Sequence, residues 1–155
     1  YNNCEKYGGN PDKISISGHS AGAHLCAMML SIDWSKFNVP TKIIKGVVLI
    51  SGIYEPEIVL NLSVNEEIKL SKQEALRNTP THPINNIQNI LICVGGEEPK
   101  GWIEQTKLYA KKIVNKGNNL DFSILEKENH FSLMISFSNS NNTYVKKIIH
   151  MAKNI

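Results

Sequence analysis

The stretch Ile16-Ser-Gly-His-Ser-Ala-Gly-Ala-His-Leu25, ISGHSAGAHL, places a serine between two glycines directly after a short apolar run. The residues before it, Lys13–Ser17, alternate apolar and polar side chains as a strand does. The residues after it, from Ala21 to about Asp33, are small or apolar and predict a largely buried helix. Ser20 therefore lies at a turn between a strand and a helix. There it serves either as a small turn residue or as a nucleophile held clear of its surroundings.

Gly18-His-Ser-Ala-Gly22 fits the pattern G-x-S-x-G, which presents a nucleophilic serine on a sharp strand-to-helix turn. Gly18 and Gly22 are expected where Cβ atoms would clash in so tight a turn. The first N–H groups of the following helix lack intrahelical acceptors, so they would point at an oxyanion formed near Ser20. A pentapeptide alone recurs by chance, but with this strand and this helix around it the pattern favours catalysis.

Strands and helices alternate along the rest of the chain. Ile43–Ser51 and Asn89–Gly95 are continuous apolar runs that predict strands buried on both faces, and Leu120–Glu126 alternates like a further strand. The segment Tyr54–Thr81 is more polar and predicts short helices that form a flap or lid. Two further helices are expected. They are Asn142–Lys153 and the amphipathic Trp102–Lys116, with Trp102, Leu108, Tyr109, Ile113 and Val114 on its inner side. This order predicts an α/β fold whose mostly parallel sheet is covered by helices on both faces.

Composition excludes several classes of function. The 155 residues are 41% hydrophobic and 20% charged, as expected of one globular domain. The net charge of +3 comes from scattered lysines without a basic stripe, so no nucleic-acid partner is expected. Apolar runs such as Val47–Ile50 are too short to span a membrane. Cys4, Cys26 and Cys93 lack metal-type spacing, and they indicate reduced thiols in a cytoplasmic protein.

A serine nucleophile needs a histidine base and an orienting carboxylate, in the chain order serine, acid, histidine. His130 fits because ENHFS follows the last predicted strand, which places its loop at the same rim of the sheet as Ser20. The other histidines fit less well: His19 and His24 belong to the turn and its helix, His82 precedes the next strand, and His150 lies on the final helix. The acid should follow the preceding strand, where Gly95-Gly-Glu-Glu-Pro99 offers both Glu97 and Glu98. Spacing alone does not choose between them.

These residues also resemble a known family. NPDKISISGHSAGAHLCAMML followed by Asp33-Trp34, then GVVLISGIYEPEIV, EALRNTP, ILICVGGEEP and ENHFS, are similar to the arylformamidase (kynurenine formamidase) family of the α/β-hydrolase superfamily. The resemblance covers nearly the whole chain. It implies an α/β-hydrolase fold and the hydrolysis of N-formyl-L-kynurenine to L-kynurenine and formate in tryptophan breakdown. It also implies that the enzyme needs no metal and no organic cofactor.

The resemblance assigns roles residue by residue. It makes Ser20 the nucleophile and His130 the base, and the N–H of Ala21 supports the oxyanion. Glu98, directly before Pro99, matches the family's acid best, and Glu97 is the second choice. Many members carry aspartate at this point, and glutamate is a tolerable departure because either carboxylate can orient an imidazole.

The family's HGG-type oxyanion loop, which precedes the serine, is absent from the sequence. Residues 1–155 are therefore expected to form a single partial domain that lacks the N-terminal strands and that loop. Alone, it is expected to be inactive and poorly soluble, because Lys13–Ser17 would form an unpaired sheet edge. Two alternatives stay open, a carboxylesterase acting on related esters and a truncated, non-catalytic remnant. The sequence also leaves a homodimer open.

Overall fold

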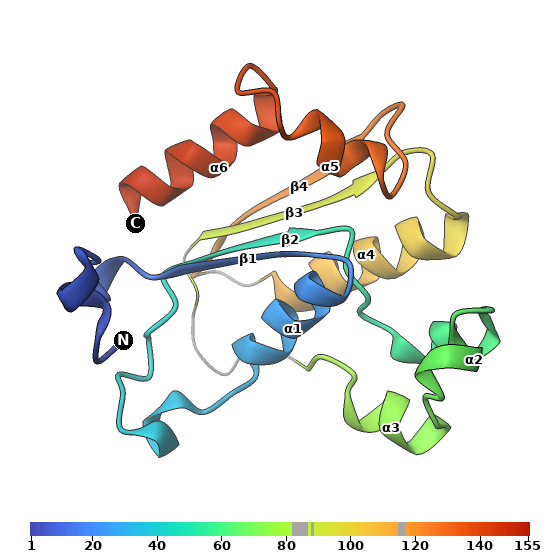
Figure 1. The fold of residues 1–155 in the computed structure, drawn as a ribbon, viewed down its shortest axis with the longest axis horizontal. Helices are drawn as coiled ribbons and strands as arrows, with labels where there is room; N and C mark the ends of the chain where they lie inside the picture. The colour runs from blue at the N-terminus through green and yellow to red at the C-terminus, as the bar shows by residue number, and fades with distance from the viewer. Residues whose placement is uncertain (82–86, 88, 115–116) are drawn as a thin grey trace.

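The computed structural model describes residues 1–81, 87, 89–114 and 117–155, and it contains a four-stranded sheet (Figure 1). The strands are β1 (Ser15–His19), β2 (Gly46–Ile50), β3 (Asn89–Gly95) and β4 (Asn119–Leu125). They are all parallel and lie in the order β1-β2-β3-β4. Every strand therefore ends at the same rim of the sheet, and the loops that carry Ser20, Glu98 and His130 all start there. The parallel sheet predicted from the sequence is confirmed.

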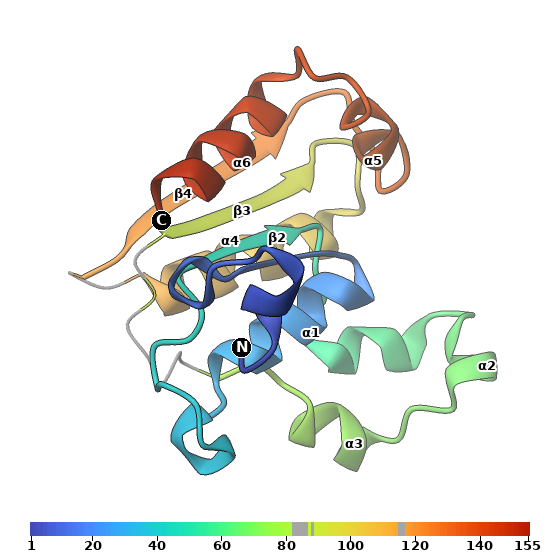
Figure 2. The same ribbon diagram turned by 60° about the vertical axis from the view of Figure 1, so that its left-hand side comes forward.

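Helices cover both faces of this sheet (Figures 1 and 2). On one face lie α1 (Ala21–Leu30) and α4 (Lys100–Ile113), and on the other lie α5 (Ser132–Ser136) and α6 (Thr143–Asn154). Short 3₁₀ helices are formed by Cys4–Tyr7, Pro11–Lys13, Trp34–Phe37 and Pro56–Asn61. Within the described ranges, no helix has the length and apolar character needed to cross a membrane.

Strand β2 is at the centre of the core. All five of its residues are buried, and successive side chains point to opposite faces of the sheet. Val47 and Leu49 pack in the cluster beneath α1 and α4, whereas Val48 and Ile50 pack in the cluster beneath α6. Full burial of such a side chain contributes about 1.5–3 kcal/mol, so this strand anchors both layers. Its expected burial on both faces is confirmed.

The inner side of α4 differs in part from the sequence prediction. Tyr109 and Ile113 are buried as expected, but Leu108 is 46% exposed and Val114 is 56% exposed. The buried residues of this helix are Gln105, Thr106, Tyr109, Ala110 and Ile113. Their spacing marks one face of the helix, and Leu108 lies off that face. Val114 has extended backbone angles and follows the last helical residue, so its side chain does not continue the stripe.

The segment between β2 and β3 forms short helices, as the sequence predicts. The 3₁₀ helix Pro56–Asn61 is followed by α2 (Asn65–Ile68) and α3 (Lys72–Arg77), which stand to one side of the sheet (Figure 1). Ser71 starts α3 with a capping box, in which its side chain accepts from the Glu74 N–H and the Glu74 carboxylate accepts from the Ser71 N–H. His82 lies outside the described residues.

Candidate active site

Ser20 occupies a strained turn between β1 and α1. Its φ of 56° and ψ of −118° are rare for a residue with a Cβ atom. Hydrogen bonds on both sides hold this conformation: the Ser20 N–H donates to the Ile50 carbonyl at 3.0 Å, and its own carbonyl accepts from the His24 N–H at 3.0 Å. Strain of this kind persists only where the surrounding structure enforces it, and it clusters at functional sites. The predicted strand–turn–helix geometry is confirmed.

The Ser20 hydroxyl does not serve as a helix cap. Serine is a preferred N-cap residue, because its oxygen can accept from the N–H groups of the first helical turn. Ser20 occupies the N-cap position of α1, yet its side chain makes no capping hydrogen bond. In the described part of the chain, the Ala21 N–H donates no backbone hydrogen bond either. Neither the Ser20 hydroxyl nor the Ala21 N–H is therefore engaged in hydrogen bonds that stabilise the start of the helix.

Of the two glycines flanking Ser20, only Gly18 lies where a Cβ atom would clash, as predicted for both. A Cβ atom on Gly18 would overlap the backbone of Gly22, so the strand and the helix approach too closely for any side chain there. A Cβ atom on Gly22 would meet no atom within 4 Å. The predicted clash at Gly22 is therefore wrong, because the turn presses Gly18 against Gly22 and leaves the outer side of Gly22 open.

Gly18→Ala is expected to destabilise the protein by more than the roughly 1–3 kcal/mol typical of core overpacking, because backbone atoms cannot yield as side chains do. Gly22→Ala is the matched control, and it should be neutral or stabilise by up to about 1 kcal/mol, since alanine favours a helix. Urea unfolding of the product of the complete coding sequence measures both changes. Equal losses for the two variants would contradict the close approach at Gly18.

Glu98 and His130 are brought together at the rim of the sheet. The Glu98 Oε2 atom lies 2.8 Å from His130 Nδ1, and the Glu98 side chain is only 1% exposed. The Gly95 N–H donates to Glu98 Oε1 at 2.9 Å, which fixes the other carboxylate oxygen. Glu97 is exposed, and its N–H donates to the Glu128 carbonyl at 2.9 Å. Of the two candidate acids, the structure pairs Glu98 with His130.

Ser51 and Trp102 join this pair, and sequence reasoning missed the role of both. Ser51 is fully buried, and its Oγ lies 2.7 Å and 2.6 Å from the two carboxylate oxygens of Glu98. The same Oγ lies 3.0 Å from His130 Nδ1 and accepts from the indole N–H of Trp102 at 3.0 Å. One sequence feature could have indicated a role for Ser51: it is the last residue of a predicted strand, at the rim that carries the other candidate residues.

The other histidines that the structure describes have structural partners or solvent around them. The His19 Nε2–H donates to the His130 carbonyl at 3.0 Å, and the two rings lie 4.5 Å apart. Burial lowers the pKa of His19, and the nearby His130 lowers it further, which favours a neutral ring beside the site. His24 Nε2 lies 2.7 Å from the Asn78 carbonyl, and His150 is exposed.

The structure pairs the acid with the base but does not pair the base with the serine. In the described residues, no hydrogen bond joins the Ser20 hydroxyl to His130, although both follow strands that end at the same rim. Catalytic hydrogen bonds are often long without substrate and shorten when it binds. The arrangement is therefore that of an acid–base pair at the same rim of the sheet as the half-buried turn serine.

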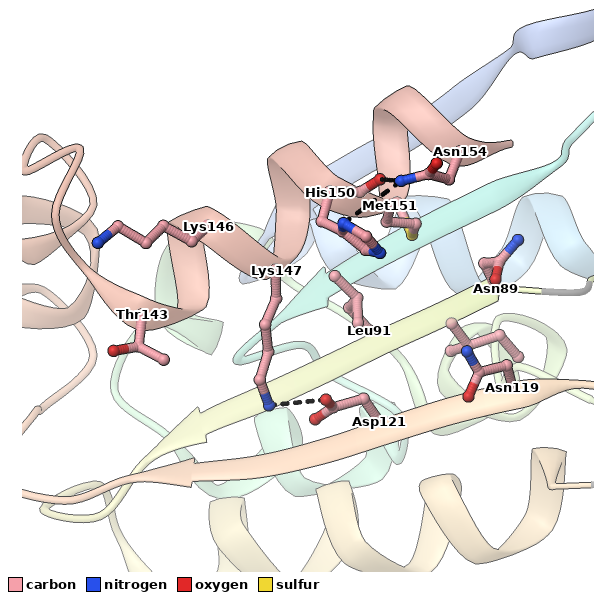
Figure 3. Close-up of a pocket in the computed structure, with 11 residues that line it drawn as sticks. Asn89, Leu91, Asn119, Asp121, Thr143, Lys146, Lys147, His150, Met151 and Asn154 are labelled. Atoms are coloured by element: carbon pink, nitrogen blue, oxygen red, sulfur yellow. Dashed lines mark hydrogen bonds and ion pairs between the residues drawn. The ribbon is translucent and has the colours of Figure 1, made fainter.

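An apolar cavity of about 380 Å³ adjoins the pair. Glu98 and His130 border it, and its other lining residues are Ile58, Leu62, Pro99, Gly101, Trp102 and Phe131. A larger cavity, of about 540 Å³, lies between α6 and the strands β3 and β4, where Lys147 pairs with Asp121 at 2.6 Å (Figure 3). Asn89 and Asn119, which line that cavity, are the first residues of their strands, so it lies at the opposite end of the sheet from Glu98 and His130.

The sequence model of the carboxylesterase family matches residues 1–151. The chain belongs to this family. Among curated proteins, it is 33% identical to kynurenine formamidase of Danio rerio over 89% of the chain and 49% of the relative. It is 34% identical to kynurenine formamidase of Salmo salar over 78% of the chain and 43% of the relative. The predicted resemblance to kynurenine formamidases is confirmed, and the chain spans about half the length of these curated relatives.

A solved esterase structure has the same fold. The esterase of Pyrobaculum calidifontis matches 99% of the chain and 56% of its own length, with a TM-score of 0.65 at 19% identity. Identity at that level shows the fold alone. This carboxylesterase-family chain is therefore an α/β-hydrolase in architecture, as predicted from its sequence.

Proposed function

We propose that the protein carrying this chain is a serine hydrolase that cleaves N-formyl-L-kynurenine to L-kynurenine and formate. The observation that carries the proposal is the buried Glu98 carboxylate 2.8 Å from His130 Nδ1, at the rim where the strained Ser20 turn also lies. The relatives named kynurenine formamidase support this substrate over others of the family. Three unpaired cysteines, two of them buried, support a reducing compartment such as the cytoplasm.

In the proposed mechanism, His130 removes the proton of the Ser20 hydroxyl as its oxygen attacks the formyl carbon. Glu98 holds the Nδ1–H of the imidazole, so that Nε2 faces the serine as the proton acceptor. The Ala21 N–H supports the oxyanion of the tetrahedral intermediate. Protonated His130 then gives its proton to the departing aryl amine, which leaves formyl on Ser20. Water, activated by the same imidazole, releases formate and restores the hydroxyl.

The apolar cavity beside His130 suits the aromatic part of such a substrate. Trp102 and Phe131 line it with ring surfaces, and Ile58 and Leu62 add aliphatic ones. A planar aryl group bound there would have its amine nitrogen beside the histidine that must protonate it. Aromatic surfaces favour such a group through offset or edge-to-face contacts.

Steady-state hydrolysis of N-formyl-L-kynurenine and of a short p-nitrophenyl ester tests this proposal in the product of the complete coding sequence. The formamide is expected to give the higher kcat/KM. Turnover of the ester alone would favour the alternative, a carboxylesterase, which the family match also supports. Hydrolysis of neither substrate would contradict the proposed function.

A further inference from the structure

Ser51 has a backbone conformation that is rare for a residue with a side chain. It follows β2 directly with a φ of 46°, in the left-handed region that residues other than glycine seldom adopt. Its N–H donates to the Cys93 carbonyl at 2.7 Å, and its side chain is fully buried. A strained, buried residue at the rim of the sheet points to a function for its side chain.

The direction of the hydrogen bonds around Ser51 follows from the chemistry of Trp102. An indole N–H can only donate, so Ser51 Oγ accepts from Trp102 Nε1 at 3.0 Å. The single hydroxyl proton of Ser51 is then free to point at Glu98, whose oxygens lie 2.7 Å and 2.6 Å away. An ionised carboxylate is purely an acceptor, so this polarity is the one that satisfies every group.

The Glu98 carboxylate depends on this arrangement because its side chain is only 1% exposed. A buried charge is tolerated only where hydrogen bonds replace the lost water. Three donors serve it: the Gly95 N–H at 2.9 Å, the Ser51 hydroxyl, and His130 Nδ1 at 2.8 Å. Ser51 is the donor that touches both carboxylate oxygens, so it also fixes the rotation of the carboxylate toward His130.

We propose that Ser51 is a positioning residue of the active site, which together with Trp102 holds the Glu98 carboxylate aimed at His130 Nδ1. This inference rests on the proposed function of Glu98 and His130. Ser51 acts through Glu98 and makes no contact with substrate in this role. Trp102 acts one step further out, by orienting the Ser51 hydroxyl.

Ser51→Ala and Ser51→Gly test the inference in the product of the complete coding sequence. Loss of a hydrogen bond to a charged group should lower kcat by about 10- to 100-fold in both variants, with KM nearly unchanged. Glycine tolerates the positive φ, so Ser51→Gly keeps the test valid should Ser51→Ala fold poorly. Ser123→Ala is the matched control. Ser123 also donates to a carboxylate, Asp121 at 3.0 Å, but on β4 away from the site, and its loss should leave kcat unchanged.

A double-mutant cycle distinguishes the positioning of Glu98 by Trp102 and Ser51 from a general disturbance of the structure. Trp102→Phe keeps an aromatic ring but removes the N–H donor, and it should lower kcat less than Ser51→Ala does. In the Ser51→Ala background, Trp102→Phe should lower kcat by a smaller factor than in the wild-type protein, because the hydroxyl that the indole N–H orients is already gone. Independent, multiplying losses in kcat would contradict the proposed chain from Trp102 through Ser51 to Glu98.

The rate at which a fluorophosphonate probe labels Ser20 distinguishes failure of this inference from failure of the proposed function. The expected result is labelling in the wild-type protein and labelling slowed by about 10- to 100-fold in Ser51→Ala. Equal rates in the two proteins would overturn the role of Ser51 and leave the function intact. A wild-type protein that is not labelled at all would overturn the proposed function, and the inference with it.

Discussion

Ser20→Ala is expected to abolish hydrolysis of N-formyl-L-kynurenine while leaving the fold intact. The hydroxyl would form the covalent bond to the formyl carbon, and loss of such a nucleophile costs on the order of a millionfold in kcat. The fold should survive, because the Ser20 side chain makes no capping hydrogen bond and its backbone bonds to Ile50 and His24 do not need the hydroxyl. Steady-state kinetics and thermal unfolding of the same preparation measure the two effects.

Ser35→Ala is a suitable control for this substitution. Its hydroxyl donates to the Asp33 carboxylate at 2.6 Å, away from the rim that carries Glu98 and His130, so kcat should stay at the wild-type value. More than a few per cent of wild-type turnover in Ser20→Ala would refute the assignment of Ser20. A loss of turnover accompanied by unfolding would also contradict the expectation that the hydroxyl has no structural role.

Glu98→Ala is expected to lower kcat by roughly 10⁴-fold, the cost of losing the orienting acid in serine proteases. Without the carboxylate, His130 Nδ1 loses the partner 2.8 Å away that holds its tautomer, and Ser51 loses its acceptor. Glu97→Ala provides the matched control in the neighbouring residue. Its side chain is exposed, so its loss should change kcat little.

Comparing these two variants also tests whether Glu98 or Glu97 is the acid that orients His130. Both remove one carboxylate from the same loop, so a change in net charge alone would affect them equally. If Glu97→Ala had the larger effect, the assignment of Glu98 would be wrong. Equal, small effects would contradict a role for either carboxylate.

The parts of the site that local sequence patterns determine could be predicted. Ser20 lies in a strand–turn–helix pattern encoded by adjacent residues, and the parallel order of the strands places His130 at the same rim. Spacing does not choose between Glu97 and Glu98, and only the family resemblance favours Glu98. The physical difference between them is burial, because the chain turns after Gly95 so that one carboxylate faces inward and the next faces water.

Other features depend on packing between distant segments and could not be predicted. The bond between Ser51 and Trp102 joins the end of β2 to the first turn of α4, 51 residues later, and no periodic pattern encodes it. The exposure of Leu108 depends on which face α4 turns to the sheet, which a short amphipathic pattern fixes only to within about one residue. The glycine pattern correctly indicates a tight turn, but the steric clash that it predicts at Gly22 occurs at Gly18 alone.

Mass spectrometry after fluorophosphonate treatment shows whether Ser20 is an activated nucleophile. The probe reacts with a serine only where a base activates its hydroxyl. The expected result is one phosphonyl adduct, carried by the peptide that contains Ser20, and no adduct in Ser20→Ala. A wild-type protein that stays unmodified, or an adduct on any other residue, would contradict the assignment of Ser20 as the nucleophile.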